Sequence, residues 1–135
     1  MTELLTKLDI RPGMSVCAIA RPKSLAELLP FATIAGPSDV TILFVHSPEE
    51  VEASIDTLLA RHRPDDRLWF AYPKKTGRIP GTLSRDHGWE ALATRDFLPV
   101  TQIAIDKDWS ALRFRPRSEI ARLTRKTDLP GRAQT

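Results

Sequence analysis

The chain has 135 residues, of which 41% are hydrophobic and 27% charged, and this composition excludes a disordered or fibrous protein. Its single cysteine, Cys17, excludes an intramolecular disulfide and favours a reducing compartment. No apolar stretch is long enough for a membrane span or a signal peptide, so we expect one soluble, cytoplasmic domain over residues 1–135 with no membrane partner.

Positive charge is concentrated near the carboxyl end of the chain. The formal net charge is +3, but residues 113–135 contain seven Lys or Arg and two acids, so the rest of the chain is slightly acidic. A basic tail over residues 117–135 can contact nucleic acid or another polyanion weakly. A solvated chain terminus is the simpler interpretation of the same residues.

The first segment predicts a short helix and then a strand. Leucines recur at helical spacing behind Thr2, and Pro12 and Gly13 turn the chain. Residues 14–20 are almost entirely apolar and lack helical spacing, which is typical of a strand covered on both faces. We expect this run to be the central strand of a sheet.

The next segments continue the alternation of helix and strand. Ser24 and Glu27 have the spacing of a capping box, which predicts a helix of one or two turns. Residues 39–46 are rich in β-branched and aromatic residues and predict a second strand. Ser47 and Pro48 then favour the start of a longer amphipathic helix that runs to about residue 61.

The second half predicts a strand, a helix and a hairpin. Residues 68–72 form a third apolar run, and a helix is expected to begin near Ser84. Residues 97–106 and 109–116 are separated by a short acidic turn, which favours two antiparallel strands. A short helix is also possible within residues 117–126.

This order of elements indicates an α/β fold with a small, doubly wound, mainly parallel sheet of five strands and helices on both faces. We expect the strand order 2-1-3-4-5, with the last strand antiparallel at the edge. The order 3-2-1-4-5 is the alternative.

The expected order also predicts where a ligand binds. Open sheets of this kind bind ligands beyond the carboxyl ends of the strands, where the winding reverses, and here that point lies between the first and third strands. Segments 20–24 and 72–77 would then face each other near the start of a helix capped by Ser24. The predicted anion-binding site consists of five cations: Arg21, Lys23, Lys74, Lys75 and Arg78. The alternative is that lysines at strand ends simply extend into water.

Motifs for cofactors and metals are absent. The loop after the first strand has no glycine, so neither the GxGxxG fingerprint nor the glycine-rich loop typical of methyl-donor sites is present, and GxxxxGK[ST] does not occur. His46, His62 and His87 lack the spacing of a helical metal site and are interpreted as surface or cap residues. Residues 106–110 lack the later ligands of a calcium loop and indicate a turn. We therefore expect no cofactor and no metal.

Catalytic signals are equally sparse. Cys17 lies in the middle of a predicted strand, and no GxSxG nucleophile elbow occurs. Trp69, Trp89 and Trp109 could stack on bases, but their positions favour packing in the core.

Three segments resemble a family of small bacterial proteins classified as a domain of unknown function: "LLTKLDIRPGMSVCAI", "LWFAYPKKTG" and "VTQIAIDKDWSALRFRPR". Members of that family read like "L..KLGIKPG", "W..WPK" and "D..WSGL+F". The most specific matches are Pro73 with Lys74 and the "D..WSxL" group that begins at Asp106, whereas Tyr72 stands where tryptophan is common. The family has no established activity, so the resemblance supports the fold and singles out Lys74 without assigning chemistry.

The leading hypothesis from the sequence is a non-enzymatic, cytoplasmic binding or interaction protein with a strand-end site for a small anionic ligand. The alternative is a small transferase or a reduced methyltransferase-like enzyme that uses the same crevice. Weak nucleic-acid binding through the basic tail is the second alternative. The sequence defines neither the partner nor the oligomeric state.

Overall fold

A computed structural model describes residues 2–120. The elements in chain order are α1 (Glu3–Lys7), β1 (Val16–Ile19), the 3-10 turn η1 (Lys23–Leu25), β2 (Val40–Phe44), α2 (Pro48–Ala60), β3 (Arg67–Pro73), α3 (Glu90–Ala93), β4 (Phe97–Ala104) and β5 (Trp109–Pro116).

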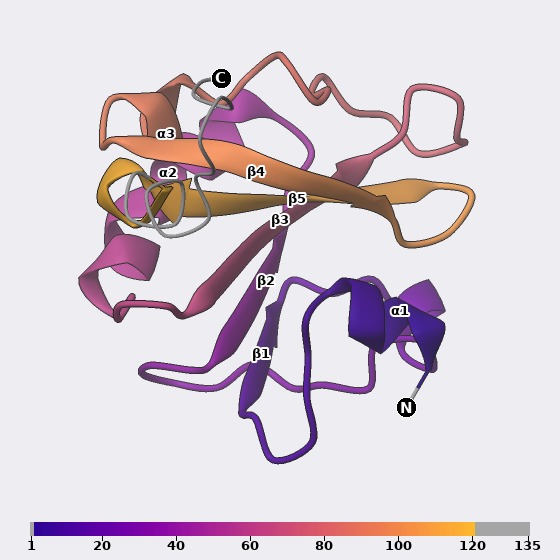
Figure 1. Ribbon diagram of the computed structural model, residues 1–135. Coiled ribbons are helices and arrows are strands. Elements are labelled where there is room, and N and C mark those ends of the chain that lie inside the picture. Colours follow the sequence, from indigo (N-terminus) through magenta and orange to yellow (C-terminus); the bar gives the residue numbers. More distant parts are fainter. Residues whose placement is uncertain (1, 121–135) are drawn as a thin grey trace, which may run out of the picture.

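The five strands form one sheet in the order β1-β2-β3-β5-β4 (Figure 1). β1, β2 and β3 are parallel to one another, whereas β5 runs antiparallel to both β3 and β4. The α/β class, the antiparallel last strand and the final hairpin are thus confirmed. The expected orders 2-1-3-4-5 and 3-2-1-4-5 are both wrong, because β1 lies at an edge and β5 lies between β3 and β4.

The exposure of the last two strands explains their positions. All residues from Trp109 to Phe114 in β5 are buried, whereas residues 99–102 of β4 are exposed. A strand buried on both faces belongs inside a sheet, and an exposed strand that contains a proline, here Pro99, belongs at its edge. β5 therefore takes the inner position beside β3.

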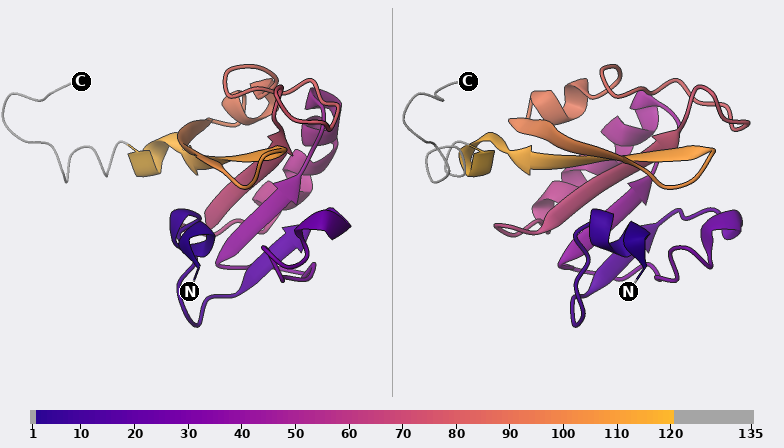
Figure 2. Two further views of the ribbon diagram at one scale, coloured as in Figure 1. Left: turned by 90° about the vertical axis from the view of Figure 1, so that its right-hand side faces the viewer. Right: turned by 45° about the vertical axis from the view of Figure 1, so that its right-hand side comes forward.

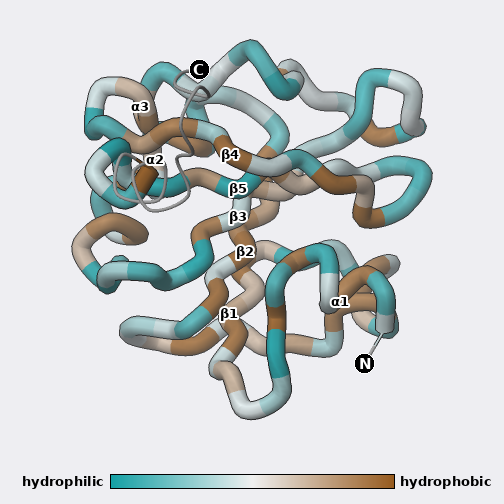
Figure 3. The backbone as a smooth tube through the Cα atoms, viewed as in Figure 1, coloured by the Kyte–Doolittle hydropathy of each residue, from teal (hydrophilic) through white to brown (hydrophobic). Residues whose placement is uncertain are grey.

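Helices cover both faces of the sheet, as expected (Figure 2). α2 and α3 cover one face, over a hydrophobic cluster that contains Phe70, Trp89 and Phe114. α1 and η1 cover the other face, over a cluster that contains Trp69 and Trp109. The hydrophilic residues lie mainly in the connecting loops (Figure 3). All three tryptophans are buried, which confirms that they pack in the core.

α2 forms as the sequence predicts. The Ser47 hydroxyl oxygen accepts a hydrogen bond from the Glu50 backbone N–H at 3.3 Å, and Pro48 occupies the first helical position, where its missing N–H costs nothing. The helix buries Val51, Ile55 and Leu58 completely or nearly so. Each such side chain contributes about 1.5–3 kcal/mol through burial of apolar surface.

Two shorter helices differ from expectation. Ser24 is not a cap, because it lies inside η1. The cap position of η1 is held by Pro22, which makes no side-chain capping bond. α3 begins only at Glu90, because residues 82–88 form an irregular loop after the expected start near Ser84. The possible helix within residues 117–126 and the basic tail lie largely outside the described residues.

The outer edge of β1 is covered by the chain's own segment 31–34. The Ala18 backbone N–H donates to the Ala32 carbonyl oxygen at 3.1 Å, and the Thr33 hydroxyl donates to the Ala18 carbonyl oxygen at 2.8 Å. The Ile34 backbone N–H lies 3.1 Å from the sulfur of Cys17, which is buried as expected. Segment 31–34 thus occupies the position at which a further strand would pair with β1.

None of the helices within residues 2–120 is long and apolar enough to span a membrane.

Candidate functional site at the carboxyl edge of the sheet

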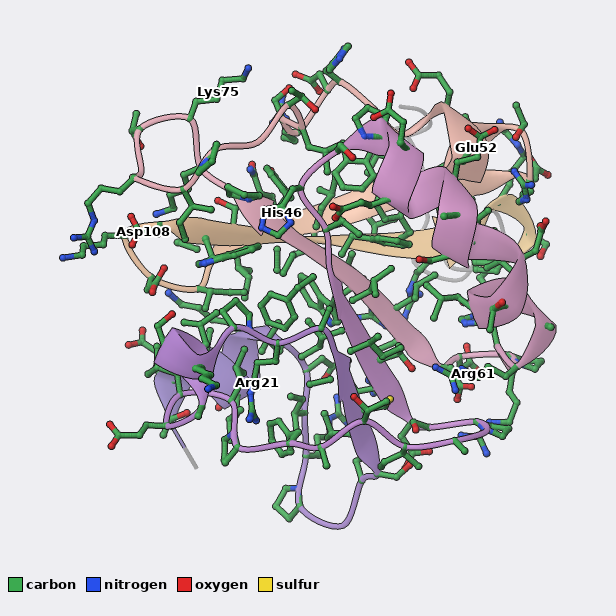
Figure 4. All side chains as sticks on the ribbon, turned by 180° about the vertical axis from the view of Figure 1, so that it is seen from behind. Arg21, His46, Glu52, Arg61, Lys75 and Asp108 are labelled. Carbon is green, nitrogen blue, oxygen red and sulfur yellow. The ribbon has the colours of Figure 1, made fainter. Side chains whose placement is uncertain are left out.

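The carboxyl ends of β1, β2 and β3 lie along one edge of the sheet, because these three strands are parallel. β2 lies between the other two, so the segments that follow β1 and β3 start roughly 10 Å apart. The predicted contact between segments 20–24 and 72–77 is therefore wrong. Figure 4 shows His46, which follows β2, between Arg21 and Lys75.

The loop over residues 74–82, here called the cationic loop, is fixed by backbone hydrogen bonds to two neighbours. The Lys74 backbone N–H donates to the Asp108 carbonyl oxygen at 2.8 Å. The Arg78 backbone N–H donates to the Asp108 carboxylate at 3.0 Å. The Thr82 backbone N–H donates to the His46 carbonyl oxygen at 2.9 Å. The loop is thus anchored to the β4–β5 turn and to the end of β2.

Two glycines make this close approach possible. A Cβ atom on Gly77 would lie 2.9 Å from the Cα atom of Asp108, and a Cβ atom on Gly81 would lie 2.9 Å from the Pro73 ring and 3.2 Å from the His46 carbonyl oxygen. Either side chain would push the loop away from its anchor.

Three predicted site residues, Lys74, Lys75 and Arg78, come together in the cationic loop. With Gly77, Ile79, Pro80 and Gly81 they line an open depression of ≈ 600 Å³. Arg78 pairs with the Asp108 carboxylate, with Nη2 at 3.2 Å from Oδ2. Within residues 2–120 the two lysine side chains make no ion pair, so the depression has an excess of positive charge.

Within residues 2–120, Asp108 is the carboxylate that forms an ion pair in the cationic loop, and its partner is Arg78. The backbone N–H and then the guanidinium of Arg78 lower the pKa of Asp108, and the positive charges of Arg78 and Lys107 add to this effect. Asp108 therefore stays ionised and holds Arg78 in place.

The other two predicted site residues, Arg21 and Lys23, lie apart from the cationic loop. Arg21 Nη1 donates to the carbonyl oxygens of Leu29 and Phe31, both at 2.8 Å, so its guanidinium holds the loop after β1 together. Lys23 is exposed on η1, a single 3-10 turn whose amino end is too short to act as an anion site.

The sequence interpretation missed His46, which it treated as a surface or cap residue. His46 Nδ1 lies 3.3 Å from Glu50 Oε1, and the same carboxylate oxygen accepts the His46 backbone N–H at 2.8 Å. The imidazole edge packs against Trp109, with 5.4 Å between ring centroids. The histidine side chain is 46% exposed, so its Nε2 atom can meet a ligand once Nδ1 is engaged by Glu50. A histidine directly after a buried strand, with a glutamate four residues later, was the available signal.

Neither the carboxyl edge nor another part of residues 2–120 forms a metal centre. Within residues 2–120 no group of three His, Cys, Asp or Glu side chains could hold a metal ion. The described residues also form a smaller depression of ≈ 270 Å³ beside β4, lined by Arg85, Asp86, Leu112 and residues 99–102. This depression contains no histidine, lysine or cysteine, so we place the candidate site at the carboxyl edge.

Comparison with known proteins bears on the fold. No protein-family model and no curated protein matches the sequence, so the resemblance to the uncharacterised bacterial family stays a prediction. Among solved structures, a tRNA methyltransferase, TrmK of B. subtilis, is similar with a TM-score of 0.50 and 10% identity over 85% of this chain and 65% of that one. A protein in the NADB-Rossmann superfamily from Streptococcus agalactiae has a TM-score of 0.51 and 10% identity over 86% of this chain and 68% of that one. Magnesium protoporphyrin IX methyltransferase from Synechocystis PCC 6803 with bound SAH has a TM-score of 0.50 and 14% identity over 76% of this chain and 74% of that one.

These similarities establish a Rossmann-like α/β fold of the kind found in methyltransferases. The chain spans 65% of the length of the tRNA methyltransferase. The hypothesis of a non-enzymatic binding protein is contradicted by these comparisons, because two of the similar structures are methyltransferases. The alternative, a small transferase or reduced methyltransferase-like enzyme, is better supported.

Proposed function

We propose that this chain is a small group-transfer enzyme of the methyltransferase-like fold, which works at the carboxyl edge formed by β2, β3 and the β4–β5 turn. The observation that carries this proposal is the His46–Glu50 pair, which lies at the foot of the cationic loop. A base and a group of cations thus lie on the same edge of the sheet, where open α/β sheets bind their ligands, and the Thr82–His46 backbone hydrogen bond joins the two segments.

The fold implies SAM as the methyl donor, but the end of β1 does not fit that cofactor. Residues 20–35, which follow β1, include no glycine, and the Arg21 guanidinium holds this segment together through the carbonyl oxygens of Leu29 and Phe31. Segment 31–34 also covers the β1 edge, so no strand on that side completes a crevice within residues 2–120. We therefore assign the chemistry from the residues that the carboxyl edge does provide.

His46 suits the role of general base. With Nδ1–H donated to Glu50, Nε2 is free to take the proton from a hydroxyl or amine acceptor as that acceptor attacks the donor. The acceptor loses its O–H or N–H bond and gains a bond to the transferred group, while the donor's leaving group departs with the bonding electron pair. The Glu50 carboxylate stabilises the imidazolium that forms, and Trp109 restricts the orientation of the ring.

The cationic loop suits an anionic donor. Lys74, Lys75 and Arg78 can bind a phosphate or carboxylate group and stabilise the negative charge that develops on the leaving group. The donor is thus predicted to carry an anionic group close to the bond that breaks.

The proposal is tested by mass spectrometry of transfer reactions. The full chain is incubated with a mixture of phosphate-bearing donors and of alcohol and amine acceptors, and paired loss of a donor and gain of a modified acceptor is measured. His46→Asn should slow this transfer by about 100-fold or more, since a general base contributes at least that factor. Glu50→Gln should have a smaller effect, because it keeps a hydrogen-bond acceptor and loses only the charge.

The matched control is His87→Asn, which removes an exposed histidine outside the site and should leave the rate unchanged. Transfer at equal rates by the wild type and His46→Asn would refute the assignment of His46. No transfer from any anionic donor, together with transfer from SAM, would refute the donor class and the interpretation of the β1 edge.

A further inference from the structure

A second group of cations lies at the opposite end of β3, on the face that α1 covers. Asp9, just after α1, accepts a hydrogen bond from Arg67 Nε at 2.9 Å and one from Arg113 Nη1 at 3.3 Å, both at Oδ2. Its other oxygen, Oδ1, accepts from Arg11 Nε at 3.2 Å. One carboxylate therefore contacts three guanidinium groups.

The strand register adds a fourth arginine to this group. Arg113 is opposite Trp69 in the β3–β5 ladder, and Arg67 lies two residues before Trp69 on the same face of β3. Arg115 lies two residues after Arg113 on the same face of β5. Arg67, Arg113 and Arg115 are thus neighbours on one face of the sheet.

Arg113 lacks partners for much of its charge. Its side chain is only 10% exposed, and its Nε and Nη2 atoms are buried without a hydrogen-bond partner in the described part of the chain. Burial and the charge of Arg115 lower the pKa of Arg113, against the opposing effect of Asp9. A buried guanidinium with unpaired N–H groups is costly unless a counter-ion satisfies it.

The charges of the group do not balance. Arg11, Arg67, Arg113 and Arg115 carry four positive charges, and Asp9 contributes one negative charge, which leaves an excess of three. A phosphate dianion in the place of Asp9 would bring two negative charges where Asp9 brings one, and the planar fork of a guanidinium matches two phosphate oxygens at once.

We propose that Arg67, Arg113 and Arg115 form a binding site for a phosphate group, which the Asp9 carboxylate occupies when no ligand is present. The Asp9 side chain is 28% exposed, so it lies at the solvent side of the group and can swing out as the phosphate enters. Asp9 has a positive φ of 61°, in the left-handed region that Asp adopts more readily than most residues other than glycine.

This site is separate from the proposed transferase site. Arg67 begins β3 and Lys74 follows its last residue, so the two sites lie roughly 20 Å apart along the strand. The phosphate site therefore does not depend on the function proposed for His46.

The experiment measures binding of inorganic phosphate by calorimetry and by thermal unfolding, in low salt, against sodium chloride of equal ionic strength. Phosphate should raise the unfolding temperature saturably, and chloride should not. Arg115→Gln should weaken phosphate binding by about tenfold, because a charge-assisted bond is lost. Asp9→Asn should strengthen it by about tenfold, because the competing negative charge is gone.

Arg85→Gln is the matched control for charge, since it removes an exposed arginine elsewhere and should leave phosphate binding unchanged. Lys74→Ala with Lys75→Ala should also leave this binding event in place. Should Asp9→Asn fail to fold, Arg115→Gln decides the outcome alone. Equal effects of phosphate and chloride, or unchanged affinity in Arg115→Gln, would overturn the proposal. Loss of binding in the double lysine variant with full binding in Arg115→Gln would also overturn it, by placing the anion on the cationic loop.

Discussion

Lys74 and Lys75 leave the carboxyl end of β3 and extend from the cationic loop without an ion pair among the described residues. The backbone of Lys74, by contrast, is fixed to Asp108 at 2.8 Å. The main chain therefore holds the loop, and the two side chains are available to a ligand.

Replacing both lysines with alanine should change the free energy of unfolding by less than about 0.5 kcal/mol, because no partner is left unpaired and the backbone anchors remain. Chemical denaturation of the wild type and the double variant measures this difference. A loss of about 1 kcal/mol or more would mean that the lysine stems cover apolar surface and serve the scaffold instead.

At the scale of single elements, a histidine just after the carboxyl end of α2 affects how stability depends on pH. His62 packs edge-on against Phe97, with 5.4 Å between ring centroids. Burial lowers the pKa of His62, and the charges of Asp66 and Glu119 only partly oppose this effect. The folded protein therefore binds a proton at His62 less readily than the unfolded chain does.

Stability should consequently fall as the pH drops below about 6.5, where the unfolded chain takes up a proton that the folded state resists, and the loss should end once the pH is below the folded pKa. His62→Gln should flatten the dependence of the unfolding free energy on pH between pH 7.5 and about 5. Denaturant titrations at several pH values measure this slope, with exposed His87→Gln as the control. An unchanged slope in His62→Gln would show that other groups cause the dependence.

The elements with strong local signals were predictable from the sequence. α2 has a cap, a proline at its first position and an apolar stripe, so its bounds agree with expectation. The predicted helix capped by Ser24 was wrong, because the Ser24–Glu27 spacing occurs here without the backbone geometry that lets Ser24 cap a helix. A pattern of side chains identifies a cap only when the capping residue itself adopts an extended conformation and the chain after it continues as a helix.

At the scale of the whole molecule, the strand order was the part that sequence could not supply. Residues 14–20 were expected to form the central strand because they are almost entirely apolar, but β1 lies at the edge, where the distant segment 31–34 covers it. Pro99 in β4 was an available sign of an edge strand, and the complete burial of β5 needed the tertiary structure.

The error in strand order determined the error in the site. Placing the first strand next to the third brought Arg21 and Lys23 to the lysines and left His46 out. With β2 between them, His46 lies beside the loop that the sequence did identify. The sequence thus predicted Lys74, Lys75 and Arg78 as a group but could not predict which base accompanies them, because this depends on which strand ends are neighbours.

The most direct test of the account is whether the cationic loop and His46 form one site. The ring resonances of His46, observed in isotope-labelled protein, are followed by NMR during a titration with pyrophosphate, in the wild type and in the Lys74→Ala and Lys75→Ala double variant. We predict a saturable shift of the His46 resonances in the wild type and a shift weakened by about tenfold in affinity in the double variant. Equal shifts in the two proteins, or no shift of His46 while pyrophosphate binds elsewhere, would contradict a shared site at the carboxyl edge.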